Sequence, residues 1–522
     1  MDNLNTRRTP ISTPAAPRLL LAILALLVLS LQGCSKKEAP QPDLSVGDPG
    51  ATQQALDGDF AFVNISVVPM TTNSVLNNQT LLIDRGHIRV IGPTDEIDLV
   101  DGIKTIDGTG RFLAPGLADM HVHLTNPNQA ALTLTYGVTT VRHMGACDDP
   151  LGVVPGTLDL IRRITSGEVL GPSIVTAGPI VDGAPKIWSD SVQLNSVEEA
   201  VNEVRAQLEK PYDFIKVYSL LPKDIFFALA EEANRLGRPF AGHLPIAVTI
   251  REALDAGMST MEHMIGFDAE TVVDGVNLGY YGSPQSAALG RSIASGATAA
   301  DSVFDAKKMA ALAREVAASD TWVVPTLTVM RGFMMSAEDK AALLKSPQMA
   351  YVSPMSRKIW IPANDYRISS ITEEDAAGHR TLAVLTMGRV KTLHDAGAKL
   401  LIGTDAPNPF VFDGLSVHEE MDLFIEAGVS VYDTIRAATA GPAEALRQNG
   451  KWGTVAPGAR ADLVLLKDNP LADVGHYRAI EGVMVRGQWL DKVRLNEIRA
   501  ETAAAYEAAV EVAKPRVSVC AH

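Results

Sequence analysis

Four histidines, one lysine and one aspartate carry the strongest chemical signal in this 522-residue chain. His121 and His123 are separated by one residue, and in an extended strand that spacing turns both imidazoles to the same side, where one metal ion can bind both. An HxH pair is common by chance and identifies no site by itself. Here the apolar run 114–122, with a proline and a glycine near its start, precedes the pair, which favours a buried strand that ends there.

The other four residues each lie on or directly after a further short apolar run. They are Lys216 in 213–218, His243 in 239–243, His263 in 259–263 and Asp405 after 399–404. Taken singly, each of these residues is more often structural than catalytic. Because all six fall at strand ends in chain order, we interpret them as one constellation.

The elements that must position these residues alternate between short apolar runs and helical patterns. The eight runs are Leu117–His123, Val138–His143, Ser173–Ala177, Phe214–Tyr218, Pro239–His243, Ser259–His263, Thr321–Thr326 and Lys399–Thr404. Alternation of this kind predicts a parallel sheet, and eight repeats predict a (β/α)₈ TIM barrel. Since the carboxyl ends of barrel strands surround one mouth, the six residues are expected to meet there.

Short strands flank this region on both sides. Segments 58–114 and 450–491 predict a small composite β-sandwich built from both ends of the chain, around a barrel over 115–449. An alanine- and glutamate-rich stretch within 492–522 predicts a terminal helix followed by a tail. The fold expected is therefore α/β, with one large and one small domain.

The constellation resembles that of the binuclear amidohydrolases, in the branch of imidazolonepropionase-like enzymes and metal-dependent prolidases. The stretches 137–142, 401–407 and 458–464 are similar to segments typical of that branch. The resemblance implies hydrolysis of an amide or related carbon–nitrogen bond and leaves the substrate open.

The resemblance also implies roles for the six residues. His121, His123 and Asp405 would hold one divalent ion, His243 and His263 a second, and a carboxylated Lys216 would bridge them. A hydroxide shared by the two ions would attack the substrate, because metal binding lowers the pKa of water. Asp405 would act as general base and then deliver the proton to the leaving nitrogen. Imidazole and carboxylate ligands suit zinc, with manganese and cobalt as alternatives.

Substrate contacts are expected from His143, Tyr218 and Arg331. For the aromatic residues of the long loops, such as Trp188, ordinary loop packing is the favoured interpretation and an aromatic pocket wall the alternative. The side chains of Tyr218 and Lys216 are expected to point to the same face of the strand, because the two residues are two positions apart. Ordinary packing for His143 and surface exposure for Arg331 are the alternatives. The segment His418–Asp422 begins like a zincin motif, but its second histidine is replaced by Asp422.

Three functions remain open at this point. The favoured one is hydrolysis of small carbon–nitrogen substrates such as N-acyl amino acids, dipeptides or cyclic amides, with a prolidase-like peptidase as its specific version. The loop 178–188 departs from the glycine- and histidine-rich loop of prolidase-like enzymes. The second is a lactone or phosphoester hydrolase with the same metals, and the third is a non-catalytic binding lipoprotein. The formal charge of −15 excludes a nucleic-acid partner, while an oligomer is compatible with the sequence.

The N-terminus has the pattern of an export signal. Three arginines precede the apolar stretch 19–31, which is too short to span a bilayer of roughly 30 Å. It ends in a Leu-Gln-Gly-Cys sequence that resembles a bacterial lipobox, which predicts a signal peptide over 1–33, acylation of Cys34 and a tether over 34–57. We expect a lipid-anchored protein of the cell envelope. Ser35, in place of an aspartate, follows the cysteine, and in bacterial lipoproteins this is typical of the outer membrane. The alternative is an ordinary secretory signal and a periplasmic protein. Cys147 and Cys520 could then pair in an oxidising compartment.

Overall fold

The computed structural model of the chain describes residues 55–147, 156–274, 276, 284–361, 364 and 372–512. The predicted signal peptide, the lipidation site Cys34, most of the tether and Cys520 lie outside the described residues. No described helix is both long enough and apolar enough to cross a membrane.

Buried parallel strands and helices alternate through the middle of the chain. These strands are β6 (Leu117–Val122), β7 (Val138–His143), β8 (Ser173–Thr176), β9 (Val181–Asp182), β10 (Val192–Gln193), β11 (Ile215–Val217), β12 (Phe240–Gly242), β13 (Thr260–Glu262), β14 (Trp322–Val324) and β15 (Lys399–Leu400). Each of the eight predicted runs contains one of them, while β9 and β10 are additional. The two faces of β6 and β7 are both buried, as expected where helices cover a parallel sheet.

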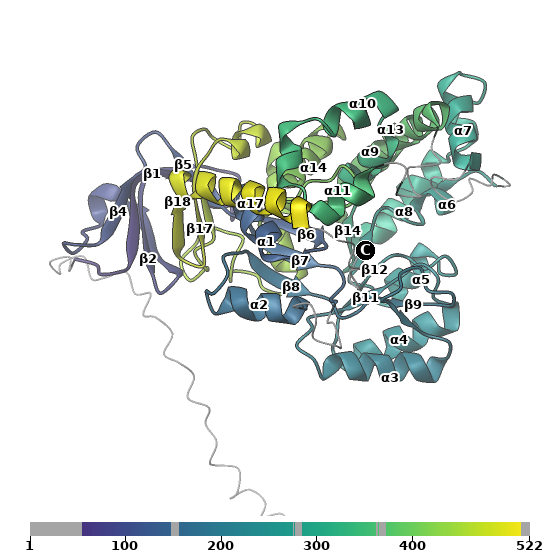
Figure 1. Ribbon diagram of the computed structural model, residues 1–522, viewed down its shortest axis with the longest axis horizontal. Coiled ribbons are helices and arrows are strands. Elements are labelled where there is room, and N and C mark those ends of the chain that lie inside the picture. The colour runs from purple at the N-terminus through teal and green to yellow at the C-terminus, as the bar shows by residue number, and fades with distance from the viewer. Residues whose placement is uncertain are drawn as a thin grey trace, which may run out of the picture. The chain divides into compact units, whose positions relative to one another are not determined.

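The helices follow these strands in chain order and cover them from outside (Figure 1). They are α1 (Pro127–Leu134), α2 (Thr157–Thr165), α3 (Val197–Leu208), α4 (Lys223–Arg235), α5 (Ile250–Asp255), α6 (Phe267–Thr271), α7 (Pro284–Ala294), α8 (Ala306–Ala318), α9 (Leu327–Met334), α10 (Ala337–Leu343), α11 (Pro354–Trp360), α13 (Glu373–Asp395), α14 (Leu415–Glu426), α15 (Val431–Ala437) and α16 (Ala440–Ala445). The two longest connections between these strands, from β13 to β14 and from β14 to β15, contain several helices each.

The parallel strands do not form the single continuous ring that the sequence predicted. One sheet has the order β6-β7-β8 and the other the order β10-β9-β11-β12-β13-β14-β15. In the described part of the chain, isolated bridges join them, Ala177 with Phe214 on one side and Val122 with Ala406 on the other. Backbone hydrogen bonds add to the second junction, where Met120 N donates to Ile402 O at 2.9 Å and His123 N to Ala406 O at 2.7 Å. The fold is thus α/β with a barrel-like order of strands, joined at two places by bridges and hydrogen bonds in place of a continuous ladder.

Strands from both chain ends pair in a separate sheet. Its members are β1 (Phe60–Val67), β2 (Leu76–Asp84), β3 (His87–Pro93), β4 (Lys104–Asp107), β5 (Phe112–Pro115), β16 (Leu463–Leu466), β17 (Ile480–Val485) and β18 (Gln488–Asp491). The order is β18-β17-β16-β5-β1-β2-β3, with β4 beside β1. β1 pairs with β4 along its first half and with β5 along its second, so the sheet branches at β1 and joins strands from both chain ends. That these strands form a two-layered sandwich stays a prediction.

The terminal helix was predicted at its observed place. α17 (Lys492–Val512) begins directly after β18 and crosses towards α1, as the yellow ribbon in Figure 1 shows. Arg499 Nη2 donates to the backbone oxygen of Thr135 at 2.9 Å, and Tyr506 Oη donates to Asn126 Oδ1 at 3.1 Å. These contacts tie the last described helix to the first helix of the α/β region.

Candidate metal centre

Five of the six residues singled out from the sequence lie at or directly after the carboxyl ends of parallel strands, and Asp405 lies five residues beyond the end of β15. His121 is in β6, His123 follows it, and Lys216 is in β11. The remaining three, His243, His263 and Asp405, come after β12, β13 and β15. Strand direction thus brings residues that are up to 284 positions apart in the chain to the same edge.

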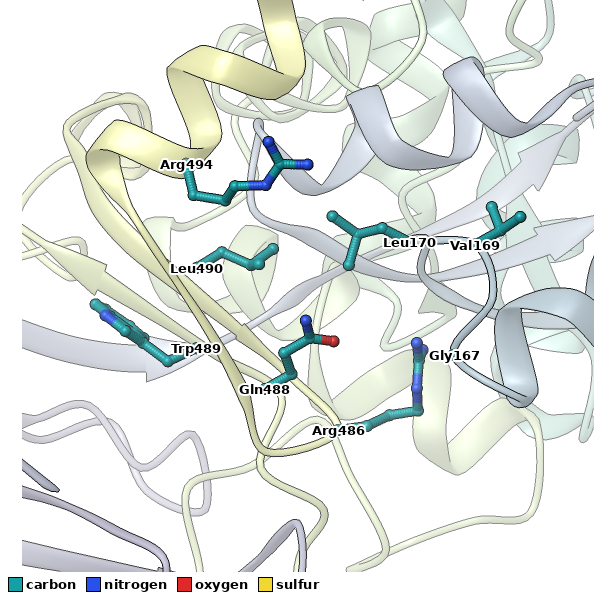
Figure 2. A pocket seen from close by; sticks show the side chains of 8 residues that line it. All are labelled: Gly167, Val169, Leu170, Arg486, Gln488, Trp489, Leu490 and Arg494. Carbon is teal, nitrogen blue, oxygen red and sulfur yellow. The ribbon is translucent and has the colours of Figure 1, made fainter. Parts of the chain in front are cut away.

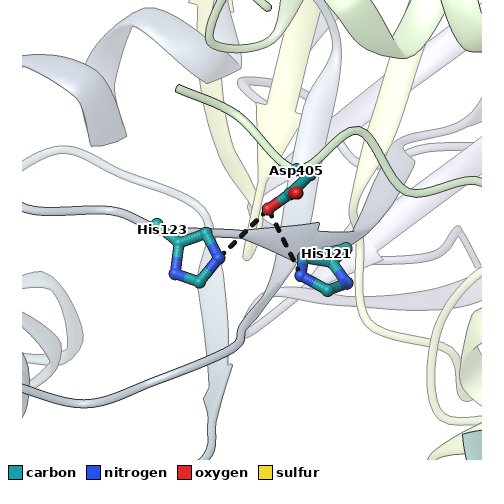
Figure 3. A group of neighbouring side chains, drawn as sticks. All are labelled: His121, His123 and Asp405. Carbon is teal, nitrogen blue, oxygen red and sulfur yellow. Dashed lines mark ion pairs between the residues drawn. The ribbon is translucent and has the colours of Figure 1, made fainter. Parts of the chain in front are cut away.

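His121, His123 and Asp405 form the tightest part of this group (Figure 3). Asp405 Oδ1 lies 3.3 Å from His121 Nε2 and 3.1 Å from His123 Nε2. One donor atom from each residue lies within 4.8 Å of the other two, a spacing that one metal ion can bridge. The backbone holds this arrangement, since Asp405 N donates to His121 O at 2.7 Å.

His263 connects this trio to His243. The ring centroid of His263 lies 4.6 Å from that of His121 and 4.7 Å from that of His243. His263 Nδ1 is also 3.9 Å from Asp405 Oδ2, so the two carboxylate oxygens face different histidines.

Lys216 lies beside His243 because Gly242 leaves it room. A side chain at Gly242, whose φ is +135°, would come within 2.8 Å of the Lys216 Cδ and 2.2 Å of the Val217 oxygen. The Lys216 side chain is 1% exposed, and among the described residues it makes no ion pair. Its ammonium lies 5.9 Å from the centre of the Tyr218 ring, and that ring stacks on His243 at 4.0 Å.

The ring of His121 is held by a buried carboxylate that sequence reasoning missed. Glu262 Oε2 lies 2.7 Å from His121 Nδ1, and Glu262 Oε1 accepts from Arg142 Nη2 at 2.8 Å. An ionised carboxylate only accepts, so His121 must carry its proton on Nδ1 and present the lone pair of Nε2 to the site. Glu262 thus joins the ring of His121 to the guanidinium of Arg142 in one buried network.

His263 is held by a hydroxyl instead. Thr326 Oγ1 lies 2.7 Å from His263 Nδ1 and donates its own proton to the oxygen of Pro325 at 2.8 Å. A hydroxyl has one proton, so His263 must be the donor to Thr326, and its Nε2 is left with a lone pair. His243 Nδ1 has a similar partner, the hydroxyl of Ser219 at 2.8 Å.

Burial keeps these imidazoles neutral. It lowers the pKa of His121 and His243 well below the ordinary value, and that of His263 to about 4, while the positive charge of Lys216 acts in the same direction. Burial also lowers the pKa of Lys216 to about 8, against the opposing fields of Glu262 and Asp405. Neutral imidazoles with fixed tautomers beside a carboxylate are a donor set that fits divalent metal ions.

A second buried carboxylate, that of Asp119, forms hydrogen bonds to the backbone beside the clustered residues. Asp119 accepts hydrogen bonds from Thr404 Oγ1 at 2.6 Å, Thr404 N at 2.9 Å and His121 N at 3.2 Å. Burial raises the pKa of Asp119 to about 7 despite these bonds. Asp119 thus joins the backbone at His121 to the residue that precedes Asp405.

Glu420 on α14 anchors the start of α9, next to Thr326. Its two carboxylate oxygens accept from the backbone N–H groups of Leu327 at 2.8 Å and Thr328 at 2.7 Å. Burial raises the pKa of Glu420 to about 7. Glu420 directly follows the His418-Glu419 pair of the failed zincin motif, and its observed role is to hold a helix end.

Two of the three residues predicted to contact the substrate lie near the clustered histidines. Tyr218 adjoins His243, and His143 has its ring centroid 6.2 Å from that of His123, so both are near the group. Arg331 on α9 makes an ion pair with Glu419 at 3.0 Å, and its side chain is 45% exposed. Cys147, which follows β7, is disulfide-bonded, and the other two cysteines of the chain lie outside the described residues.

A pocket of about 270 Å³ lies elsewhere, between residues 167–170 and the hairpin that leads into α17 (Figure 2). Residues 167–170 precede β8, so this pocket is at the amino end of the strand, opposite to the histidines. Its two guanidinium groups already have partners, because Arg486 donates to the Gly171 oxygen at 3.1 Å and Arg494 pairs with Glu501 at 2.7 Å. None of the six clustered residues lines it.

Comparison with known proteins identifies the family. The model of the Amidohydrolase family matches residues 112–490, which is more than half of the chain. The protein belongs to the amidohydrolase family. The matched range includes all six clustered residues, and metal binding at this cluster agrees with the general use of a metal centre in the family.

Curated relatives match over short stretches only. A 5-methylthioadenosine/S-adenosylhomocysteine deaminase of Symbiobacterium thermophilum is 36% identical over 73 residues, 14% of this chain and 15% of the relative. An adenine deaminase of Shewanella halifaxensis is 29% identical over 89 residues, 16% of this chain and 15% of the relative. The chain therefore spans about 15% of the length of these relatives.

Solved structures match over most of the chain. A bottromycin amidohydrolase superposes with a TM-score of 0.66 at 23% identity, covering 85% of this chain and 90% of that one. A Xaa-Pro dipeptidase with bound methionine superposes with a TM-score of 0.59 at 20% identity, covering 83% and 99%. At these identities the likeness establishes the amidohydrolase fold, and the substrate has to be inferred separately.

Proposed function

We propose that this protein is a metal-dependent hydrolase of carbon–nitrogen bonds in small molecules, with two divalent ions held by the six clustered residues. The observation that carries the proposal is the convergence of His121, His123 and His263 on the carboxylate of Asp405. His121, His123 and Asp405 would hold one ion, and His243 with His263 the other. Zinc suits these ligands best.

When bound, the ions would polarise the scissile carbonyl and lower the pKa of the attacking water. Asp405 would orient that water, accept its proton and pass it to the departing nitrogen, because its two oxygens face both groups of histidines. Glu262 and Thr326 would hold the imidazoles of His121 and His263 in place during these steps.

Lys216 is proposed to be carboxylated and to bridge the two ions. A buried ammonium without an ion-pair partner is costly, and two nearby cations would increase that cost. A carbamate changes the charge from positive to negative and turns the side chain into a ligand. Carbon-13 NMR of the folded protein kept in labelled bicarbonate should show a carbamate signal that a Lys216→Ala variant lacks, and a Lys216→Ala variant with full activity would contradict the assignment.

Dipeptides and N-acyl amino acids are the proposed substrates, with a prolidase-like peptidase as the specific version. The similarity in fold to a Xaa-Pro dipeptidase supports this choice. The decisive experiment is an assay of zinc-loaded protein against a library of dipeptides, N-acyl amino acids and cyclic amides, beside lactones and phosphotriesters. Turnover confined to the last two classes would replace the proposal with an ester hydrolase, and no turnover of any class would favour a binding protein.

We also propose export to the cell envelope with a lipid anchor at Cys34. The disulfide of Cys147 bears on this proposal, because pairing with Cys520 would leave Cys34 available for acylation. Peptide mapping under non-reducing conditions should find Cys147 linked to Cys520. A Cys34→Ala variant should then move from the membrane fraction to the soluble periplasmic fraction. A Cys34–Cys147 link would contradict the anchor.

A further inference from the structure

The carboxylate of Asp182 links the loop 183–188, which follows β9, to the segment after β11 by backbone hydrogen bonds. The buried carboxylate of Asp182 accepts from Gly183 N at 2.9 Å and Ile187 N at 3.1 Å within its own loop. It also accepts from Leu220 N at 2.7 Å, four residues beyond Lys216. Three backbone bonds to one buried carboxylate give the loop 183–188 a fixed position beside the candidate metal centre.

This loop brings Trp188 against Tyr218. Trp188 Nε1 donates to Tyr218 Oη at 2.8 Å, and the Tyr218 ring stacks on His243 with an interplanar angle of 27°. An indole N–H can only donate, so the phenol oxygen accepts in this bond and its own proton is directed away from Trp188. The bond therefore makes Tyr218 a donor on its other side.

We propose that Trp188 is a positioning residue that orients the Tyr218 phenol to donate a hydrogen bond to the carbonyl oxygen of the substrate. The inference rests on the proposed function, because it requires a scissile carbonyl next to His243. It extends the substrate description to compounds whose carbonyl oxygen gains negative charge during attack, since a fixed O–H donor is most useful to that oxygen. Trp188 itself would act only through Tyr218.

The alternative is that Trp188 only packs against the loop or touches the substrate directly. Trp188→Phe separates these roles, because phenylalanine keeps an aromatic ring and removes the N–H. Tyr218→Phe removes the phenol oxygen, and the double variant tests whether the two effects share one path. Trp489→Phe, on β18 in the pocket at the amino ends of the strands, is the matched control.

The measurement is kcat and KM for a dipeptide or N-acyl amino acid that the zinc-loaded wild type hydrolyses. Tyr218→Phe should lower kcat by about 100-fold, as expected for one donor to a developing oxyanion. Trp188→Phe should lower kcat by about 5-fold with little change in KM, which corresponds to one neutral hydrogen bond. In the Tyr218→Phe background, Trp188→Phe should change kcat by less than about twofold.

Several results would overturn the inference. An equal effect of Trp188→Phe in both backgrounds would show that it does not act through Tyr218. A raised KM with unchanged kcat would show that Trp188 contacts the substrate directly. An unchanged kcat and KM would show that the indole N–H has no role in positioning.

A second readout needs no activity. The ultraviolet resonance Raman band of the Trp188 indole, obtained as the difference between wild type and Trp188→Phe, reports whether its N–H is hydrogen-bonded. It should shift in Tyr218→Phe, and an unshifted band would overturn the inference. A wild type that hydrolyses no library member would overturn the proposed function and this inference with it, while the Raman shift would still report the contact.

Discussion

The two groups of histidines in the candidate metal centre are supported by different chemistry. His121 donates to Glu262, a carboxylate that is itself paired with Arg142 and fully buried. His263 donates to the hydroxyl of Thr326, and His243 lies against that of Ser219. A carboxylate partner makes an imidazole a stronger ligand, whereas a hydroxyl mainly fixes its orientation. In the two-ion centre proposed above, an ion at His121 and His123 should therefore be held more tightly than an ion at His243 and His263.

Removing the carboxylate that faces both groups should have the largest effect. Asp405→Asn keeps the size of the side chain and one acceptor oxygen but loses the charge and the base. We expect kcat to fall by about 1000-fold, as for the loss of a general acid–base group. The measurement is turnover of the amide that the wild type hydrolyses, with circular dichroism as the check on folding. A loss below tenfold would contradict the role of Asp405.

The difference between the Glu262 carboxylate and the Thr326 hydroxyl as partners of the metal-site histidines can be tested by changing each residue. Glu262→Gln should weaken the binding of one zinc ion by about 10- to 100-fold. Thr326→Val, which removes only the hydroxyl, should weaken the binding of the other ion by about 3- to 10-fold. Competition with a chromophoric chelator measures both affinities.

Thr326→Ser, which keeps the hydroxyl, is the control and should behave as the wild type. Equal losses from Glu262→Gln and Thr326→Val would abolish the distinction between the two groups. Since Glu262→Gln leaves Arg142 buried without its counter-charge, thermal unfolding must be followed in parallel.

Graded chelation of the wild type should remove the ions in two steps. Metal analysis after dialysis against increasing chelator should show a one-ion species, because a difference in support of this kind separates the two affinities by about tenfold. A His243→Ala variant should keep one ion through the first step. Loss of both ions in a single step would contradict the comparison.

The smallest expected effect on metal affinity comes from changing Glu420, which holds the start of α9 next to Thr326. Glu420→Gln keeps one acceptor for the start of α9 and leaves one of the two N–H groups without its partner. We expect the more weakly held ion to lose about threefold in affinity, in keeping with one backbone hydrogen bond. Glu419→Gln, on the same helix but paired with the half-exposed Arg331, should leave metal affinity unchanged. An effect on both ions alike would indicate a general loss of packing.

Much of the fold could be predicted because apolar runs and helix patterns are local. The strands β6 and β7 and the helix α17 lie where the sequence placed them. The early end of β15, the added strands β9 and β10, and the pairing of β1 with both β4 and β5 could not be predicted. These features depend on which segments become hydrogen-bonding neighbours, and periodicity carries no information about that.

The sequence by itself determined which side chains could bind metal and that they end successive strands, because residue type and strand alternation are local properties. Only the tertiary structure decided their supports, such as Glu262 against the ring of His121 and Asp182 against the backbone N–H of Leu220. These partners are 141 and 38 positions apart in the chain, and no spacing rule connects them. Tautomers and neighbouring charges are properties of the folded core, because burial makes each polar group depend on the partner it meets there.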